Sequence, residues 1–73
     1  MGRPTKVSNN IRRLRFEQGE MTQAQLADEV GVTRQTIIAI EHGRYSPSLD
    51  MAFEIARAFG VSLEEVFQYR EEM

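Results

Sequence analysis

Apolar residues recur along this chain every three or four positions, which is the spacing of one face of an α-helix. The clearest run is Ala52, Ile55 and Phe59, and Ile37 and Ile40 repeat the spacing nearer the middle. The pattern predicts five helices, at about residues 9–18, 22–30, 33–42, 48–59 and 62–67. Their inward faces predict a single core made of Ile11, Leu14, Leu26, Ala27, Val30, Val32, Ile37, Ile40, Ala52, Ile55, Ala56, Phe59, Val61, Leu63 and Val66. No segment alternates long enough for a substantial strand, so the fold class is all-α.

Glycines and capping residues set the ends of these helices. A glycine follows each of the first four stretches, as a residue that ends a helix in the left-handed conformation does: Gly19, Gly31, Gly43 and Gly60. The expected N-caps are Ser8 or Asn9, Thr22, Thr33, Ser48 and Ser62. Thr22 and Ser62 are followed three residues later by Gln25 and Glu65, which is the spacing of a capping box.

The two ends of the chain leave two interpretations open. Thr5–Ser8 and Val66–Tyr69 can each be extended and pair as a small two-stranded antiparallel ribbon, or they can stay irregular. No apolar run approaches the roughly 20 residues that span a bilayer, and no apolar block of a signal peptide follows the first residues. We therefore expect one soluble, cytoplasmic domain over residues 1–73.

Composition removes several classes of chemistry. The chain has no cysteine and one histidine, His42, so it cannot form disulfides, zinc–thiolate clusters or iron–sulfur sites, and we expect no metal and no cofactor. A domain of 73 residues buries only about 60% of the surface that its unfolded chain exposes, which makes it marginally stable. Oligomerisation is the expected additional source of stability.

Charge is divided unevenly along the chain. The net charge is −2, but residues 1–44 hold seven Lys/Arg against five acids, whereas residues 45–73 hold two against six. Such asymmetry is typical of a molecule with one basic face. Eight of the nine cationic residues are arginine, the side chain better suited to bidentate contacts with phosphate or guanine.

Residues 22–43 carry the most specific motif. Two short helices meet at Gly31, which allows a sharp turn, and Ala27 is small where the first helix must cross the second closely. Val30, Val32 and the isoleucines of the second helix can hold the two together. This is the helix-turn-helix pattern, in which the second helix lies in the major groove of DNA.

The outward face and first turn of the second helix carry side chains that can read bases. They are Thr33, Arg34, Gln35, Thr36, Ile38 and Ala39. Arginine recognises guanine through O6 and N7, glutamine recognises adenine through N6 and N7, and the Thr and Ile methyl groups can contact thymine. The alternative is a helical hairpin whose polar face only meets water.

The motif and its surroundings resemble the Cro and phage-repressor type of helix-turn-helix regulators, the xenobiotic-response-element-like family. The matching segments are residues 22–23, 26–27, 31–37, 40–43, 47–49, 52–56 and 60–67, so the resemblance covers about residues 9–67. The chain is most similar to the short stand-alone members. The resemblance implies a five-helix, lambda-repressor-like domain with a terminal ribbon joining residues near 6–8 to 67–69. It also implies a homodimer that represses transcription at a palindromic operator, with a helix-turn-helix core at 22–43 and dimerisation through 44–73.

The resemblance supports Arg34, Gln35 and Ala39 and adds Gln23 and three residues after the second helix, so the residues expected to contact double-stranded DNA are Gln23, Thr33, Arg34, Gln35, Thr36, Ile38, Ala39, Arg44, Tyr45 and Ser46. Arg34 and Gln35 occupy positions that usually meet base edges, and Ala39 can offer only methyl contact there. Gln23 is expected to contact phosphate and to brace the first residue of the recognition helix. The loop residues Arg44, Tyr45 and Ser46 are expected to contact the DNA backbone. The Tyr45 ring can instead simply cover the loop.

Other arginines have competing roles. Arg15 and Glu41 resemble the buried ion pair with which the family ties its first helix to its third. Arg12 and Arg13 can contact phosphate or only water. Residues 2–6 can form an arm that enters the minor groove, but a solvated tail is the favoured interpretation.

Two further hypotheses concern the acidic half. Phe53, Leu63 and Phe67 are candidates for the dimer interface, since a symmetric dimer presents the same apolar patch twice. Adjacent acids on a helix do not share a face, and no nucleophile triad or phosphate loop is present, so we expect no enzyme. The rival function is an antitoxin-like adaptor that binds a protein partner through its acidic C-terminal half.

Overall fold

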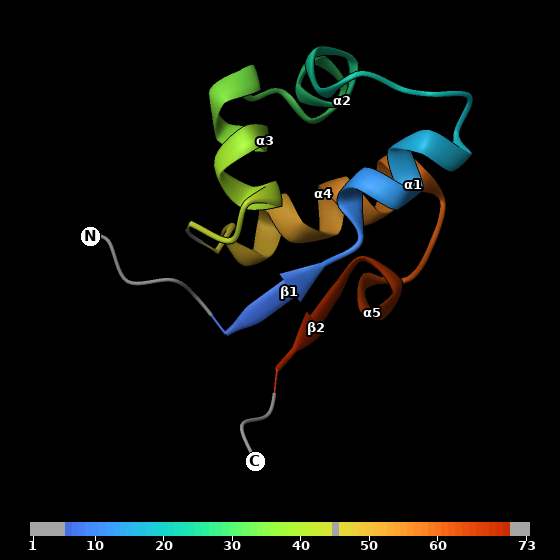
Figure 1. The fold of residues 1–73 in the computed structure, drawn as a ribbon. Coiled ribbons are helices and arrows are strands. Elements are labelled where there is room, and N and C mark those ends of the chain that lie inside the picture. The colour runs from blue at the N-terminus through green and yellow to red at the C-terminus, as the bar shows by residue number, and fades with distance from the viewer. Residues whose placement is uncertain (1–5, 45, 71–73) are drawn as a thin grey trace.

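The computed structural model describes residues 6–44 and 46–70, and this part of the chain forms five α-helices and one two-stranded sheet (Figure 1). The elements are β1 (Val7–Asn9), α1 (Ile11–Glu17), α2 (Gln23–Val30), α3 (Arg34–Glu41), α4 (Leu49–Phe59), α5 (Leu63–Val66) and β2 (Phe67–Tyr69). The five predicted helices are confirmed. Each is slightly shorter than predicted, because a capping residue has non-helical dihedral angles and lies just outside its helix.

The ends of the described chain pair as an antiparallel ribbon, which settles the alternative that the sequence left open. Val7 lies opposite Tyr69 and Asn9 lies opposite Phe67. The Arg70 backbone N–H donates to the Lys6 carbonyl oxygen at 2.8 Å, which continues the ladder by one residue. Figure 1 shows the ribbon on the side of the molecule away from α2.

Both predicted capping boxes are present. The Thr22 hydroxyl accepts from the Gln25 backbone N–H at 3.0 Å, and the Gln25 side-chain oxygen accepts from the Thr22 N–H at 2.8 Å. Ser62 and Glu65 form the same reciprocal pair at the start of α5. These bonds satisfy backbone donors that the first helical turn would otherwise leave without partners.

The predicted N-cap of the first helix is wrong. Ser8 and Asn9 belong to β1, and pairing with β2 holds their backbone extended, so Asn10 takes the cap position. Asn10 makes no side-chain capping bond, but the Asn9 side-chain oxygen accepts from the Ile11 N–H at 3.0 Å. The Asn9 amide also donates to the Ile40 carbonyl at 3.0 Å, which ties the ribbon to the end of α3.

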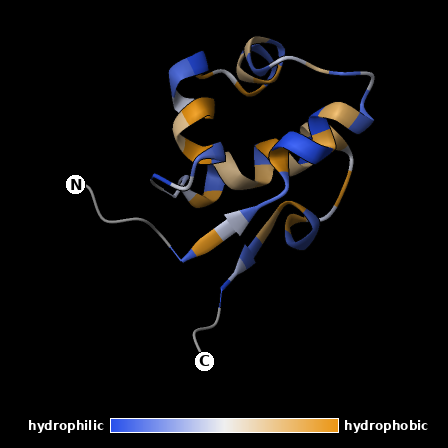
Figure 2. Cartoon of the chain, viewed as in Figure 1, coloured by the Kyte–Doolittle hydropathy of each residue, from blue (hydrophilic) through white to orange (hydrophobic). Residues whose placement is uncertain are grey.

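One apolar core joins all five helices. Its buried members are Ile11, Leu14, Leu26, Ala27, Ile37, Ile40, Ile55, Ala56, Phe59 and Val66, and Val30, Val32 and Val61 pack against it from partly buried positions. The helices carry both hydrophobic and hydrophilic residues, as Figure 2 shows. Full burial of each large aliphatic side chain contributes about 1.5–3 kcal/mol, so α3 is held firmly on its inner side. Within the described residues, no helix has the length and apolarity that crossing a membrane requires.

Candidate nucleic-acid interface

α2 and α3 are joined by a turn that fixes their relative orientation. Gly31 ends α2 with a φ of 83°, in the left-handed region that residues with a Cβ adopt at a cost. The N–H groups of Gly31 and Val32 both donate to the Ala27 carbonyl, at 2.8 and 2.9 Å. Ala27 is itself buried, so the two helices cross at a small side chain. The local geometry is the one that the sequence motif predicts.

α3 divides its residues sharply between an inner and an outer face. Ile37 and Ile40 are buried in the core. Arg34 and Gln35 are exposed in the first turn, and neither side chain has a hydrogen bond or ion pair to any residue in 6–44 or 46–70. Thr36, Ile38 and Ala39 are half-buried along the edges of the exposed face. The outer face therefore presents a guanidinium and an amide whose hydrogen-bonding capacity is unused by these residues.

Thr33 has a structural role in addition to its predicted contact with DNA. Its hydroxyl caps α3 by accepting from the Thr36 N–H at 3.2 Å, and it lies 3.0 Å from the Thr36 hydroxyl. The two hydroxyls thus occupy one another at the start of the helix. The first turn of α3 still directs its remaining N–H groups and the positive end of the helix dipole outward, which favours an anion there.

A buried carboxylate ties α3 to α1 and α2. Glu41, whose side chain is 6% exposed, accepts from the Arg15 Nε at 2.6 Å and from Arg15 Nη2 at 3.2 Å. Arg15, 15% exposed, also donates through Nη1 to the Met21 carbonyl at 2.9 Å. The predicted ion pair is thus present as a bidentate contact, the geometry that gives an arginine–carboxylate pair its strength. It braces the helix-turn-helix from behind α3.

Gln23 begins α2, as the resemblance implies, but its side chain bonds to a different residue of α3. Its amide Nε2 donates to Glu41 Oε1 at 3.2 Å, so its side chain reaches the last residue of α3 and not the first. The cause is the buried carboxylate, which has room for one more donor beside Arg15 and would otherwise leave a lone pair unused. Sequence reasoning missed this contact because it joins residues that are 18 positions apart.

The segment after α3 is arranged by its own backbone. His42 is the C-cap, and Gly43 follows with a φ of 71°. The Arg44 N–H donates to the Ala39 carbonyl at 2.9 Å, and Arg44 is exposed just beyond the end of α3. Ser46 is also exposed, whereas the predicted contact of Tyr45 falls outside the described residues.

The remaining arginines of α1 separate into two kinds. Arg13 pairs with Glu17 at 3.2 Å, one helical turn away and on the surface. That pairing follows the favourable i,i+4 spacing and could have been predicted from the sequence. Arg12 is exposed and has no such partner among the described residues.

The residues predicted for the dimer interface differ in exposure. Phe53 is 49% exposed on α4. Phe67 is half-buried and packs against the core of its own chain, and Leu63 is half-buried as well. Of the predicted interface residues, the exposed one is thus on α4, where Leu49 is exposed as well; Phe16 on α1 and Tyr69 on β2 are also exposed.

Comparison with known proteins agrees with this geometry. The helix-turn-helix family model matches residues 11–66, which include α1 through α5. The chain belongs to the helix-turn-helix family. Members of this family are DNA-binding transcriptional regulators and not enzymes, and the match confirms the resemblance to Cro and phage-repressor proteins.

Helix-turn-helix relatives are found in both archaea and bacteria. An uncharacterized transcriptional regulator of this type from Methanocaldococcus jannaschii is 56% identical over 52 residues, covering 71% of this chain and 79% of its own length. One from Bacillus subtilis is 46% identical over 66 residues, covering 90% and 98%. The transcriptional repressor RstR of a cryptic Vibrio cholerae phage is 36% identical, covering 81% of this chain and 52% of its own. A crystal structure from Bacteroides fragilis superposes with a TM-score of 0.75 at 26% identity, over 85% and 98% of the two chains.

Proposed function

We propose that this helix-turn-helix regulator is a homodimeric repressor that recognises a palindromic operator, with α3 of each subunit in the major groove. Repression would act by occlusion, since a dimer bound across a promoter blocks access to it. The similarity to proteins named as repressors, RstR and the immunity repressor of Bacillus phage phi105, supports the direction of regulation.

The exposed face of α3 carries the proposal. The side chains of Arg34 and Gln35 have no hydrogen-bond partner among residues 6–44 and 46–70, while the buried isoleucines hold the helix against the core. In a major groove the N-terminal residues of a recognition helix meet base edges, where arginine selects guanine and glutamine selects adenine. Ala39 and Ile38, farther along the same face, would offer methyl contact to thymine.

Contacts to the backbone would position α3 over the bases. Thr33 and Thr36 stand at the helix N-terminus, and Arg44, Tyr45 and Ser46 follow its end, so both ends of the helix would be held by phosphates. One amide hydrogen of the Gln23 side chain is already donated to Glu41. Gln23 can therefore bind phosphate only through its second amide hydrogen or through its backbone N–H. The low net charge implies weak non-specific binding, since little diffuse positive field remains to add to these contacts.

The direct experiment is selection of bound sequences from a random duplex pool at ~150 mM salt with the purified chain, a salt concentration at which non-specific contacts are weakened. We expect enrichment of a palindrome whose half-sites are about one helical turn apart, ~34–36 Å. Failure to enrich any sequence, with the fold intact by circular dichroism, would contradict the proposal. It would favour the adaptor hypothesis, in which the acidic C-terminal half binds a basic protein.

A further inference from the structure

The outer face of α4 carries charges of opposite sign at its two ends. Asp50, Phe53, Glu54 and Arg57 are all exposed, and their spacing of three, four and seven residues places them in one stripe along the helix. Neither the Asp50 carboxylate nor the Arg57 guanidinium has a hydrogen bond or ion pair to another residue within the described ranges 6–44 and 46–70. The stripe is therefore an unpartnered helix face with an acid in its first turn and a base in its last.

The charges of this stripe are complementary to those of a second copy that runs in the opposite direction. In a two-fold dimer, residue i of one subunit contacts residue j of the other, and residue j contacts residue i. An axis through the middle of α4, between Phe53 and Glu54, brings Asp50 of each subunit opposite Arg57 of its partner. One arrangement thus forms two identical ion pairs, whereas parallel packing of the two helices would place like charges together.

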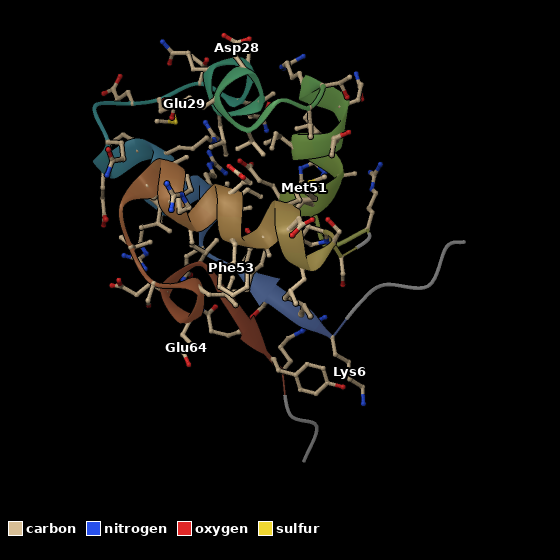
Figure 3. All side chains as sticks on the ribbon, turned by 180° about the vertical axis from the view of Figure 1, so that it is seen from behind. Lys6, Asp28, Glu29, Met51, Phe53 and Glu64 are labelled. Carbon is tan, nitrogen blue, oxygen red and sulfur yellow. The ribbon has the colours of Figure 1, made fainter. Side chains whose placement is uncertain are left out.

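Phe53 supplies the apolar part of the same contact. It points from α4 toward the side of the molecule that carries α5 and the ribbon, well away from Asp28 on α2 (Figure 3). Beside the dyad it meets Phe53 of the partner, and the half-buried Leu63 and Phe67 can continue the apolar surface. Glu54 falls on the opposite edge of the stripe, where it stays in water.

We infer that a second copy of this chain docks on the outer face of α4, with the two α4 helices antiparallel and Asp50 of each subunit paired with Arg57 of the other. The inference rests on the homodimer in the proposed function and adds its geometry. It assigns the interface to Asp50, Phe53 and Arg57 first, and to Leu63 and Phe67 only at the margin.

The positions of Asp50 and Arg57 have a second explanation, which a reversal of both charges can separate from the first. An acid in the first turn and a base in the last turn also favour the dipole of α4 itself. Reversing both charges therefore worsens α4 as an isolated helix. The same double reversal restores opposite charges across the proposed interface, so the two explanations predict opposite results.

The experiment measures dimer dissociation by sedimentation equilibrium at low salt, without DNA. Asp50→Arg and Arg57→Asp should each loosen the dimer about 10- to 100-fold, because each turns two ion pairs into two repulsions. The double variant Asp50→Arg/Arg57→Asp should regain affinity within a few-fold of wild type. Asp28→Arg, which reverses an exposed acid on α2, is the matched control and should change little.

Mixing the two single variants gives a second, independent outcome. Asp50→Arg has an arginine at both ends of its stripe and Arg57→Asp has an aspartate at both ends, so together they should form a heterodimer tighter than either homodimer. Glu54→Gln should leave the dimer intact or tighten it slightly. Circular dichroism establishes that each variant is folded.

The outcomes separate this inference from the proposed function. If the wild-type chain dimerises and single reversals, double reversal and mixture all match the Asp28→Arg control, the antiparallel α4 contact is wrong while the homodimer stands. If the wild-type chain is monomeric both free and on its selected duplex, the homodimer in the proposed function is wrong as well.

Discussion

The outer faces of α3 and α4 differ in chemistry, although both helices bury their inner faces in one core. α3 presents Arg34 and Gln35, which are hydrogen-bond donors suited to phosphates and base edges. α4 presents Asp50 and Phe53, and a carboxylate there would repel a phosphate backbone. The difference explains how a chain of net charge −2 can bind DNA: the outer face of α3 carries a cation and no acid, whereas the outer face of α4 carries acids as well as Arg57, so each face suits a different partner.

The outer face of α3 keeps its orientation because α3 is bonded to α1 and α2 on its inner side. Loss of Glu41, the residue that makes these bonds, should have the largest effect on stability. Glu41→Ala should lower the free energy of unfolding by about 3–5 kcal/mol, because it leaves Arg15 as a largely buried charge without its partner. Denaturant titration followed by circular dichroism measures the change.

The matched control replaces both partners. Arg15→Met/Glu41→Leu should be close to wild type in stability, since no charge is left unpaired. A double variant as unstable as Glu41→Ala would show that the pair contributes through something other than its mutual compensation.

The two faces of α3 can be separated by one variant on each. Ile37→Ala should cost about 2–5 kcal/mol of stability, because it opens a cavity under the helix. Gln35→Ala should change stability by less than about 0.5 kcal/mol, since the side chain is exposed and unpartnered among the described residues. Thermal and chemical unfolding of the two variants side by side give the answer, and equal losses would be inconsistent with the division into faces.

Gln35→Ala should instead act on DNA recognition. Removal of a bidentate hydrogen bond to adenine is expected to reduce discrimination at one base pair of each half-site by about 1–3 kcal/mol. Competition binding with duplexes substituted at each position of the selected site measures this. Unchanged preference at every position would remove Gln35 from the base-reading set.

The smallest expected effects concern the caps of the two helices. Thr33→Ala and Ser48→Ala remove the side-chain acceptors that cap α3 and α4, and each should cost roughly 1 kcal/mol of stability. Only Thr33→Ala should also weaken DNA binding, since Thr33 is the N-cap of the proposed recognition helix. Equal effects of both variants on DNA affinity would contradict the assignment of DNA binding to α3 and not to α4.

Local features made most of the fold predictable. Caps such as Thr22 and Ser62 act within one helical turn, so residue types three positions apart are enough to locate a helix start. The helix-turn-helix likewise depends on short-range features, a left-handed Gly31 and a small Ala27. These interactions are decided by neighbours in the sequence.

Contacts between distant segments were harder to predict. Whether residues 7–9 would pair with 67–69 depended on how the helices bring the chain ends together, and that pairing displaced the first N-cap to Asn10. The bond from Gln23 to Glu41 depends in the same way on where α3 ends relative to α2. At the candidate site, the sequence correctly predicted that Arg34 and Gln35 would be exposed, but it predicted neither the partial burial of Ile38 nor which polar side chains the protein would use for its own support.

The central claim is that α3 reads bases while the following loop holds phosphates. The most direct measurement is the affinity of Arg34→Ala and Arg44→Ala for the selected duplex and for a random duplex, over a range of salt concentrations. Arg34→Ala should lose about 1–3 kcal/mol on the selected duplex and little on the random one, so its specificity ratio falls. Arg44→Ala should weaken both duplexes alike and reduce the salt slope by about 0.9 for each phosphate that the protein no longer neutralises. If Arg34→Ala weakened both duplexes equally, the assignment of base reading to α3 would be wrong.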